Sequence, residues 1–129
     1  MKRKSLLIKL LLVLVLLPCL SYGAVFTDSV ALDGGWKWSP WFGYYHDGNE
    51  SFNGSEGWIY HLEHDWLYVL ENPGNGMFLW GEPSGWWWTS STVYPFVYSF
   101  DHQSWFWYDP GSTNPRWFYN YQLGHWVSL

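Results

Sequence analysis

Aromatic side chains dominate this chain and occur in closely spaced pairs. Trp, Tyr and Phe make up 24% of the 129 residues, and thirteen residues are tryptophan. An exposed indole or phenol ring can stack on the apolar face of a sugar or lie against a cation, while nearby hydroxyl, amide and carboxyl groups provide hydrogen bonds. These residue types therefore predict non-covalent recognition rather than bond-making chemistry.

Some of the rings are stronger candidates for an exposed, ligand-binding role than others. The candidates are Trp58, Trp66, Tyr68, Trp86, Trp88, Trp105, Trp107 and Trp117. The alternative is that they interlock as a core, with each cross-strand pair contributing roughly 0.2–1 kcal/mol. A single domain of roughly 100 residues has too little interior for all thirteen tryptophans, so we expect several of them to face solvent.

The densest group of possible metal ligands is the segment His61-Leu62-Glu63-His64-Asp65. His61 and Glu63 would share one face of a strand. A metal site needs three or four ligands with fixed geometry, and two histidines three residues apart in a turn fall short of that. We therefore predict neither a metal nor a cofactor.

Acidic residues provide the only candidates for catalysis. Glu63 with Glu82, or Asp101 with Asp109, could in principle pair for glycoside hydrolysis, but nothing in their spacing separates them from solvated turn residues. The same carboxylates beside indoles could instead hold a cation. The sequence contains no nucleophile elbow and no phosphate-binding glycine loop, so we expect a protein that is not an enzyme and has no catalytic residues.

The rings are ordered in four tandem units that begin at residues 58, 78, 96 and 117. Each unit contains two short segments with rings at alternate positions, as in Trp58-Ile59-Tyr60 and Trp66-Leu67-Tyr68. Alternate residues lie on one face of a strand, so each unit predicts one β-hairpin. The gaps hold turn formers such as Gly81–Gly85, and no helical apolar stripe is present. The predicted fold is all-β, with tandem aromatic hairpins of about 20 residues in a solenoid or a closed antiparallel meander.

The repeat is predicted to extend over one domain, residues 35–129, with a degenerate first unit near 36–46. The other units are near 58–70, 78–90, 96–108 and 117–128. The residues between paired rings are also apolar, so one face should be buried while the other is a second packing layer or an exposed aromatic platform. These intervening residues are Ile59, Leu67, Leu79, Val97, Phe106, Phe118 and Val127.

The first 23 residues have the pattern of a secretory signal peptide. A basic start at residues 2–4 precedes the apolar run Leu6–Leu17, and small residues around Ala24 suit cleavage. The run is short for a membrane span, which needs about 20 residues; the alternative is lipoprotein processing at Cys19. We predict a lead-in segment at 24–34, location outside the cell or in the cell envelope (periplasm or surface) of a bacterium, and no membrane span after cleavage.

Cleavage would leave a strongly acidic chain without cysteine. Only Lys37 and Arg116 remain as basic residues against eleven acidic ones, which gives a formal net charge of −9. Nucleic acids and anionic membrane surfaces need basic patches, so we expect neither as a partner.

Several short motifs resemble a known type of repeat. Gly57-Trp58 followed by Trp66-Leu67-Tyr68, and Gly85-Trp86, are similar to the Gly-Trp and Trp-Tyr-Tyr repeats of choline-binding and related cell-wall-binding modules. Residues 58–129 also resemble aromatic-rich C-terminal modules of secreted bacterial proteins. The resemblance implies stacked β-hairpins whose rings form shallow ligand sites. Because exposed rings stack on sugar faces, we expect a polysaccharide or cell-wall glycan as the partner. The alternative is a structural module that docks to a partner surface protein or to copies of itself.

Overall fold

The computed structural model of the protein describes residues 25–129, so the predictions of a signal peptide at 1–23 and of lipoprotein processing at Cys19 lie outside the described residues. The described chain forms eleven strands and one short 3-10 helix, η1 (Asp33–Gly35). The strands are β1 (Val30–Ala31), β2 (Trp36–Ser39), β3 (Gly43–His46), β4 (Glu56–His61), β5 (Asp65–Glu71), β6 (Met77–Gly81), β7 (Gly85–Thr89), β8 (Phe96–Ser99), β9 (Ser104–Tyr108), β10 (Trp117–Asn120) and β11 (His125–Ser128).

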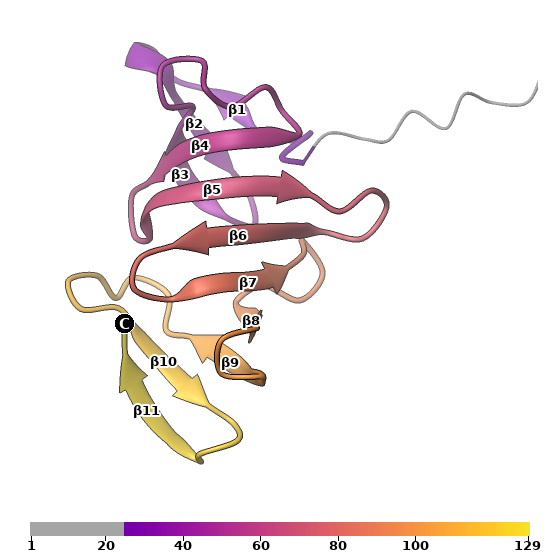
Figure 1. The fold of residues 1–129 in the computed structure, drawn as a ribbon. Helices are drawn as coiled ribbons and strands as arrows, with labels where there is room; N and C mark the ends of the chain where they lie inside the picture. The colour runs from indigo at the N-terminus through magenta and orange to yellow at the C-terminus, as the bar shows by residue number, and fades with distance from the viewer. Residues whose placement is uncertain (1–24) are drawn as a thin grey trace, which may run out of the picture.

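All eleven strands belong to one antiparallel sheet in which each strand pairs with its neighbours in sequence (Figure 1). The prediction of an all-β antiparallel meander is confirmed. The alternative of a closed meander is wrong, because β1 and β11 end the sheet and do not pair with each other within residues 25–129. Strand β1 has two residues, and both pair with β2.

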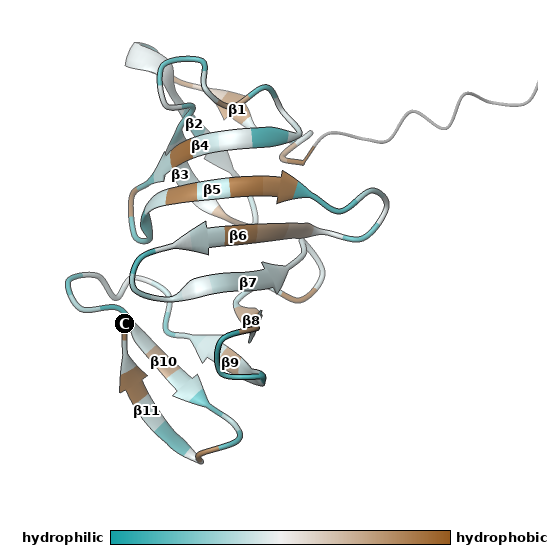
Figure 2. Cartoon of the chain, viewed as in Figure 1, coloured by the Kyte–Doolittle hydropathy of each residue, from teal (hydrophilic) through white to brown (hydrophobic). Residues whose placement is uncertain are grey.

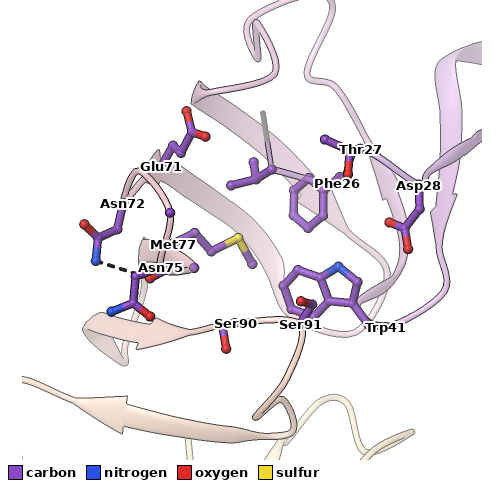
Figure 3. A pocket seen from close by; sticks show the side chains of 13 residues that line it. Phe26, Thr27, Asp28, Trp41, Glu71, Asn72, Asn75, Met77, Ser90 and Ser91 are labelled. Atoms are coloured by element: carbon purple, nitrogen blue, oxygen red, sulfur yellow. Dashed lines mark hydrogen bonds between the residues drawn. The ribbon is translucent and has the colours of Figure 1, made fainter. Parts of the chain in front are cut away.

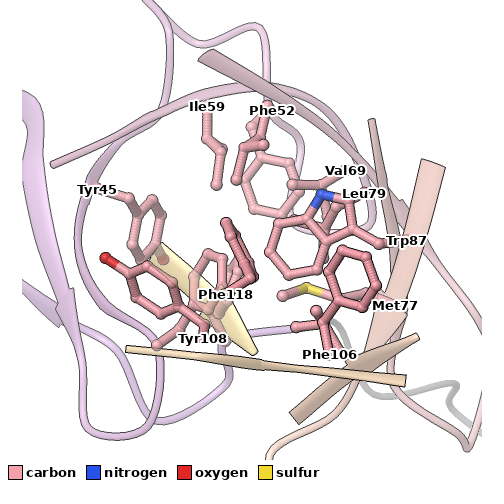
Figure 4. Packing of buried hydrophobic residues seen from close by; sticks show 14 residues of the cluster. Tyr45, Phe52, Ile59, Val69, Met77, Leu79, Trp87, Phe106, Tyr108 and Phe118 are labelled. Atoms are coloured by element: carbon pink, nitrogen blue, oxygen red, sulfur yellow. The ribbon is translucent and has the colours of Figure 1, made fainter. Parts of the chain in front are cut away.

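One face of this curved sheet encloses the core (Figure 4). The apolar residues that separate paired rings in the sequence point inward: Ile59, Leu67, Leu79, Val97, Phe106 and Phe118 are at most 2% exposed. The predicted lead-in segment belongs to the fold, since it contains β1 and since Phe26 is buried against Phe42 and Tyr45. Polar residues occupy the β5–β6 and β6–β7 turns, whereas β5 and β6 contain strongly apolar residues (Figure 2).

Four of the hairpin turns are held by a buried polar side chain at the end of the first strand. In each case its side-chain oxygen or nitrogen accepts a hydrogen bond from the backbone N–H three residues later, as in turns stabilised by Asn or Ser. The bonds are Ser39 Oγ with Phe42 N, His61 Nδ1 with His64 N, Ser99 Oγ with His102 N and Asn120 Oδ1 with Leu123 N, at 3.1–3.3 Å.

We expect Asn120→Ala to lower the free energy of unfolding by about 1–3 kcal/mol, because it leaves buried hydrogen-bonding groups without partners. Asn120 Oδ1 also accepts hydrogen bonds from the Gln122 N–H and the Ser104 hydroxyl. Urea denaturation at neutral pH measures the loss. Gln122→Ala in the same exposed turn is the control, and equal effects of the two substitutions would contradict the role given to Asn120.

Gly57, the glycine of the first Gly-Trp dipeptide, occupies a position that only glycine fits. Its φ is +128°, and an added Cβ would lie 2.1 Å from the Ser51 carbonyl oxygen. We expect Gly57→Ala to cost about 3 kcal/mol, since backbone strain and steric overlap each cost roughly 1–3 kcal/mol. Thermal denaturation of Gly57→Ala and Gly74→Ala isolates the cost of the steric overlap at Gly57. At Gly74, φ is +73° and nothing lies within 4 Å of an added Cβ. Equal losses would show that the Ser51 contact does not matter.

Candidate functional site

The outer face of the sheet is covered by aromatic side chains. Along each strand, inward residues alternate with outward rings, so that in β4 Ile59 is buried while Trp58 and Tyr60 point out. The same alternation continues to β10, where Phe118 is buried between Trp117 and Tyr119. Because strand residues alternate between faces, the period of the sequence places nearly every ring of the paired segments on one continuous surface.

The directly paired outward residues include four rows of aromatic and imidazole rings, each of which crosses four consecutive strands. Row 1 is Trp36, His46, Tyr60 and Trp66; row 2 is Trp58, Tyr68, Trp80 and Trp86; row 3 is Phe78, Trp88, Tyr98 and Trp105; row 4 is Phe96, Trp107, Tyr119 and Trp126. Each row begins two strands after the one before it. Adjacent hairpins are therefore joined by a row of rings as well as by backbone hydrogen bonds.

Rings within a row pack edge to face. In row 2, Trp58 lies 5.5 Å from Tyr68 and 6.0 Å from Trp80 between ring centroids, with interplanar angles of 74° and 86°. In row 4, Tyr119 and Trp126 are 5.6 Å apart at 79°. Such pairs contribute about 0.5–1.5 kcal/mol beyond the area that they bury. These contacts stabilise a sheet face that no second layer of the described chain covers.

Most tryptophans remain accessible despite this packing. Only Trp87 is buried, and seven of the thirteen are 36–50% exposed. All eight residues predicted from the sequence lie on the outer face. Trp58, Trp66, Trp86, Trp105 and Trp117 are exposed, and Tyr68, Trp88 and Trp107 are half-buried.

Some of the eight predicted residues contact one another, whereas Trp117 lies apart from the rest. Trp88 contacts Trp105, at 6.2 Å and 85°, and Tyr68 contacts both Trp58 and Trp86. Trp117 lies outside the four rows, where it pairs with Ser128.

Trp126, which the sequence-based list omits, is 48% exposed. It occupies the same place in its hairpin as Trp66, Trp86 and Trp105. That shared position was the signal that could have identified it.

A polar cluster lies inside the fold, and sequence patterns did not reveal it. His61 Nε2 donates to the Phe42 carbonyl at 2.7 Å, because its Nδ1 accepts the backbone N–H groups of Glu63 and His64. His64 Nδ1 accepts from Arg116 at 3.3 Å, which leaves Nε2–H to donate to the Tyr94 hydroxyl at 2.8 Å. His64 and Arg116 are 52 residues apart in sequence, and His64 and Tyr94 are 30 apart, so local spacing does not indicate that they meet.

Burial keeps these histidines neutral. Removal from water is the main cause that lowers the pKa of His61 to about 4; the hydrogen bond to the Phe42 carbonyl opposes this shift, and the nearby Arg116 guanidinium adds to it. The pKa of His64 falls well below its usual value, first because of burial and then because of His61 and Arg116. Burial also lowers the pKa of Arg116 itself. The cluster therefore contains one cation and two neutral imidazoles near pH 7.

The predicted absence of a metal rested on the segment 61–65, whose two histidine rings pack together with centroids 4.7 Å apart. His61 and His64 point into the core, whereas Glu63 accepts a hydrogen bond from Gly111 N. The Glu63 carbonyl also accepts from Thr113, so this residue fixes the loop after β9. Within residues 25–129 no three His, Cys, Asp or Glu side chains come together as metal ligands.

Two cavities lie near the ends of the strands. One, of about 470 Å³, lies beside the polar cluster and is lined by Glu63, Asp65, Glu82 and Arg116. The other, of about 280 Å³, lies between the lead-in segment and the loops after β5 and β7 (Figure 3). Phe26 and the Trp41 indole border it together with side-chain amides and hydroxyls of those loops.

Comparison with protein-family models, with curated protein sequences and with solved structures finds no match to this chain. Among the described residues, no helix has the length and apolar character needed to cross a membrane.

Proposed function

We propose that this chain is an exported, non-catalytic module that binds polysaccharide or cell-envelope glycan through the exposed Trp and Tyr rings of its outer face. The proposal rests on one observation: eight sequence-selected rings lie on one face, and five of them are exposed. An exposed contiguous aromatic surface of this size marks an interaction site. Indole faces match the apolar faces of pyranose rings, while the surrounding turns supply polar groups for the hydroxyls.

The regular spacing of the rings supports a further part of the proposal, that the sheet is a tandem array of aromatic hairpins. Four rows of rings follow one pattern, and four hairpin turns use the same buried acceptor position. Each hairpin then presents equivalent rings to the ligand. Export remains an inference from residues 1–23.

Tryptophan fluorescence tests glycan binding directly, because exposed indoles change their emission when a sugar covers them. We expect saturable quenching or a blue shift on titration with soluble glycans and peptidoglycan fragments, and retention on insoluble polysaccharide. Trp66→Ala and Trp105→Ala should weaken binding without loss of fold, as checked by circular dichroism. The absence of any response to a panel of neutral and charged glycans would refute the proposal.

The open edge of the sheet favours a second function, docking to a partner surface protein or to another copy of the chain. Strand β11 pairs with β10 on one side only, and it carries the exposed Trp126 with neither Pro nor Lys, residues that protect many edge strands. Sedimentation velocity over a range of protein concentrations separates the two functions. Association that depends on concentration, together with no response to sugars, would favour the structural role.

A further inference from the structure

One tryptophan recurs at the same place in four successive hairpins. Trp66, Trp86, Trp105 and Trp126 are each the second residue of the second strand of a hairpin, directly after the turn. Each also ends one of the four rows and is 38–50% exposed. We name these four residues the edge tryptophans, because the four turns lie along one edge of the meander.

A tyrosine packs edge to face against each edge tryptophan. It lies directly across the strand pair in three cases, and for Trp86 it lies two strands away, at 6.5 Å. Trp66 packs against Tyr60 at 69°, and Trp105 packs against Tyr98 at 70°, both with centroids 5.5 Å apart. The two other pairs are Tyr68 with Trp86 at 85° and Tyr119 with Trp126 at 79°. Fixing a ring before binding reduces the entropy that a ligand must offset, so these indoles are preorganised.

The edge tryptophans are evenly spaced. Successive members are two strands apart and shifted by two residues along the strand, which corresponds to roughly 12 Å in a flat sheet. The right-handed twist of strands turns this line into a shallow curve on the outer surface. A compact ligand reaches one or two of these rings, whereas an extended chain reaches several.

Acidic residues near the edge tryptophans limit which extended ligands can bind. Asp65 precedes Trp66, and the Asp101 carboxylate lies beside Gly85, which precedes Trp86. Glu82 is exposed in the turn between β6 and β7. The basic residues of the described chain are Lys37, which lies 3.9 Å from Asp47, and the buried Arg116. Carboxylates around the indoles repel an anionic polymer, because like charges brought together at an interface are costly.

We infer that the edge tryptophans form one linear site for an unbranched, extended glycan without acidic groups, which crosses the strands and contacts one indole per hairpin. This inference rests on the proposed function and specifies its ligand class and geometry. Binding then depends on chain length, because each further tryptophan is engaged within an already formed complex.

Isothermal titration calorimetry with β-1,4-linked glucose and N-acetylglucosamine oligomers, from disaccharide to octasaccharide, tests this geometry. We expect affinity to rise about tenfold or more from the disaccharide to the octasaccharide, which corresponds to about 1.4 kcal/mol. Polygalacturonate, an unbranched anionic glycan, should bind much more weakly than the neutral octasaccharide at low salt.

Single variants locate the site. Trp86→Ala and Trp105→Ala should each lower octasaccharide affinity about tenfold, while disaccharide affinity changes less. Phe96→Ala is the matched control, because Phe96 is 41% exposed on the same face, at the opposite end of its hairpin from Trp105, which is 42% exposed. It should leave octasaccharide affinity within twofold of the parent protein.

Two outcomes would overturn the inference while leaving glycan binding intact: equal affinities for disaccharide and octasaccharide, or equal losses for Phe96→Ala and Trp105→Ala. Tight binding of polygalacturonate would overturn its charge requirement. If no glycan binds at all, the proposed function itself fails, and the two failures are thereby distinguished.

Discussion

Acidification should strongly destabilise this protein, with about 3 kcal/mol of the free energy of unfolding lost through His61 alone, since one pKa unit corresponds to about 1.4 kcal/mol. The pKa of His61 is 6.5 in its ordinary state and about 4 in the fold, because burial disfavours the imidazolium. Between these values the unfolded chain takes up a proton that the folded chain does not. The stability that neutral His61 provides is therefore complete above pH 6.5 and decreases as the pH falls to about 4.

His64 acts in the same direction, because its pKa is also lowered by burial, by His61 and by Arg116. Urea denaturation at a series of pH values between 7 and 4 measures the combined effect. Fitting the slope with pH gives the difference in bound protons between the unfolded and folded states.

A matched variant separates this effect from general acid denaturation. His61→Asn keeps an acceptor for the turn, as Asn120 provides in the last hairpin, but it cannot titrate. We expect this variant to be less stable at pH 7 and to lose less stability than the parent protein between pH 6.5 and 4. His125→Asn, at an exposed position, is the control for the substitution itself. Parallel pH profiles for the parent protein and His61→Asn would refute the assignment.

Trp87→Ala should be among the most destabilising substitutions, at about 3–5 kcal/mol, the usual cost of removing a large buried ring. Trp87 is 2% exposed and packs against His64, with centroids 5.3 Å apart. Trp86→Ala, one residue earlier in β7, should cost only about 0.5–1.5 kcal/mol, because it loses one edge-to-face contact with Tyr68. Guanidinium denaturation of both variants measures the difference.

The pair is informative because the two residues are identical and adjacent. Trp86 should matter for binding and Trp87 for folding. Trp87→Phe should cost less than Trp87→Ala, since phenylalanine fills most of the space and removes an indole N–H that has no hydrogen-bond partner. Similar losses of stability for Trp86→Ala and Trp87→Ala would contradict the inward and outward assignment of β7.

Much of the architecture follows from local patterns. Rings at alternate positions require strands, since only a period of two places them on one face. Turn-forming residues between the ring segments then require hairpins, and hairpins in succession give a meander. The outer-face residues could be predicted for the same reason. Alternate residues of a strand lie on opposite faces, and this alternation is visible in the sequence.

Other features depend on contacts that no short segment contains. Phe26 looked like part of a linker, yet it is buried because the curved sheet leaves space beside Phe42 and Tyr45.

The sequence by itself determined the strands, the hairpins and the set of rings that face outward, because these depend on a two-residue period and on turn chemistry. The tertiary structure alone decided that the sheet stays open, that His61, His64 and Arg116 meet inside it, and that four tryptophans line one edge. Those outcomes depend on how twist accumulates from strand to strand and brings distant residues together. Spacing along the chain does not contain that information.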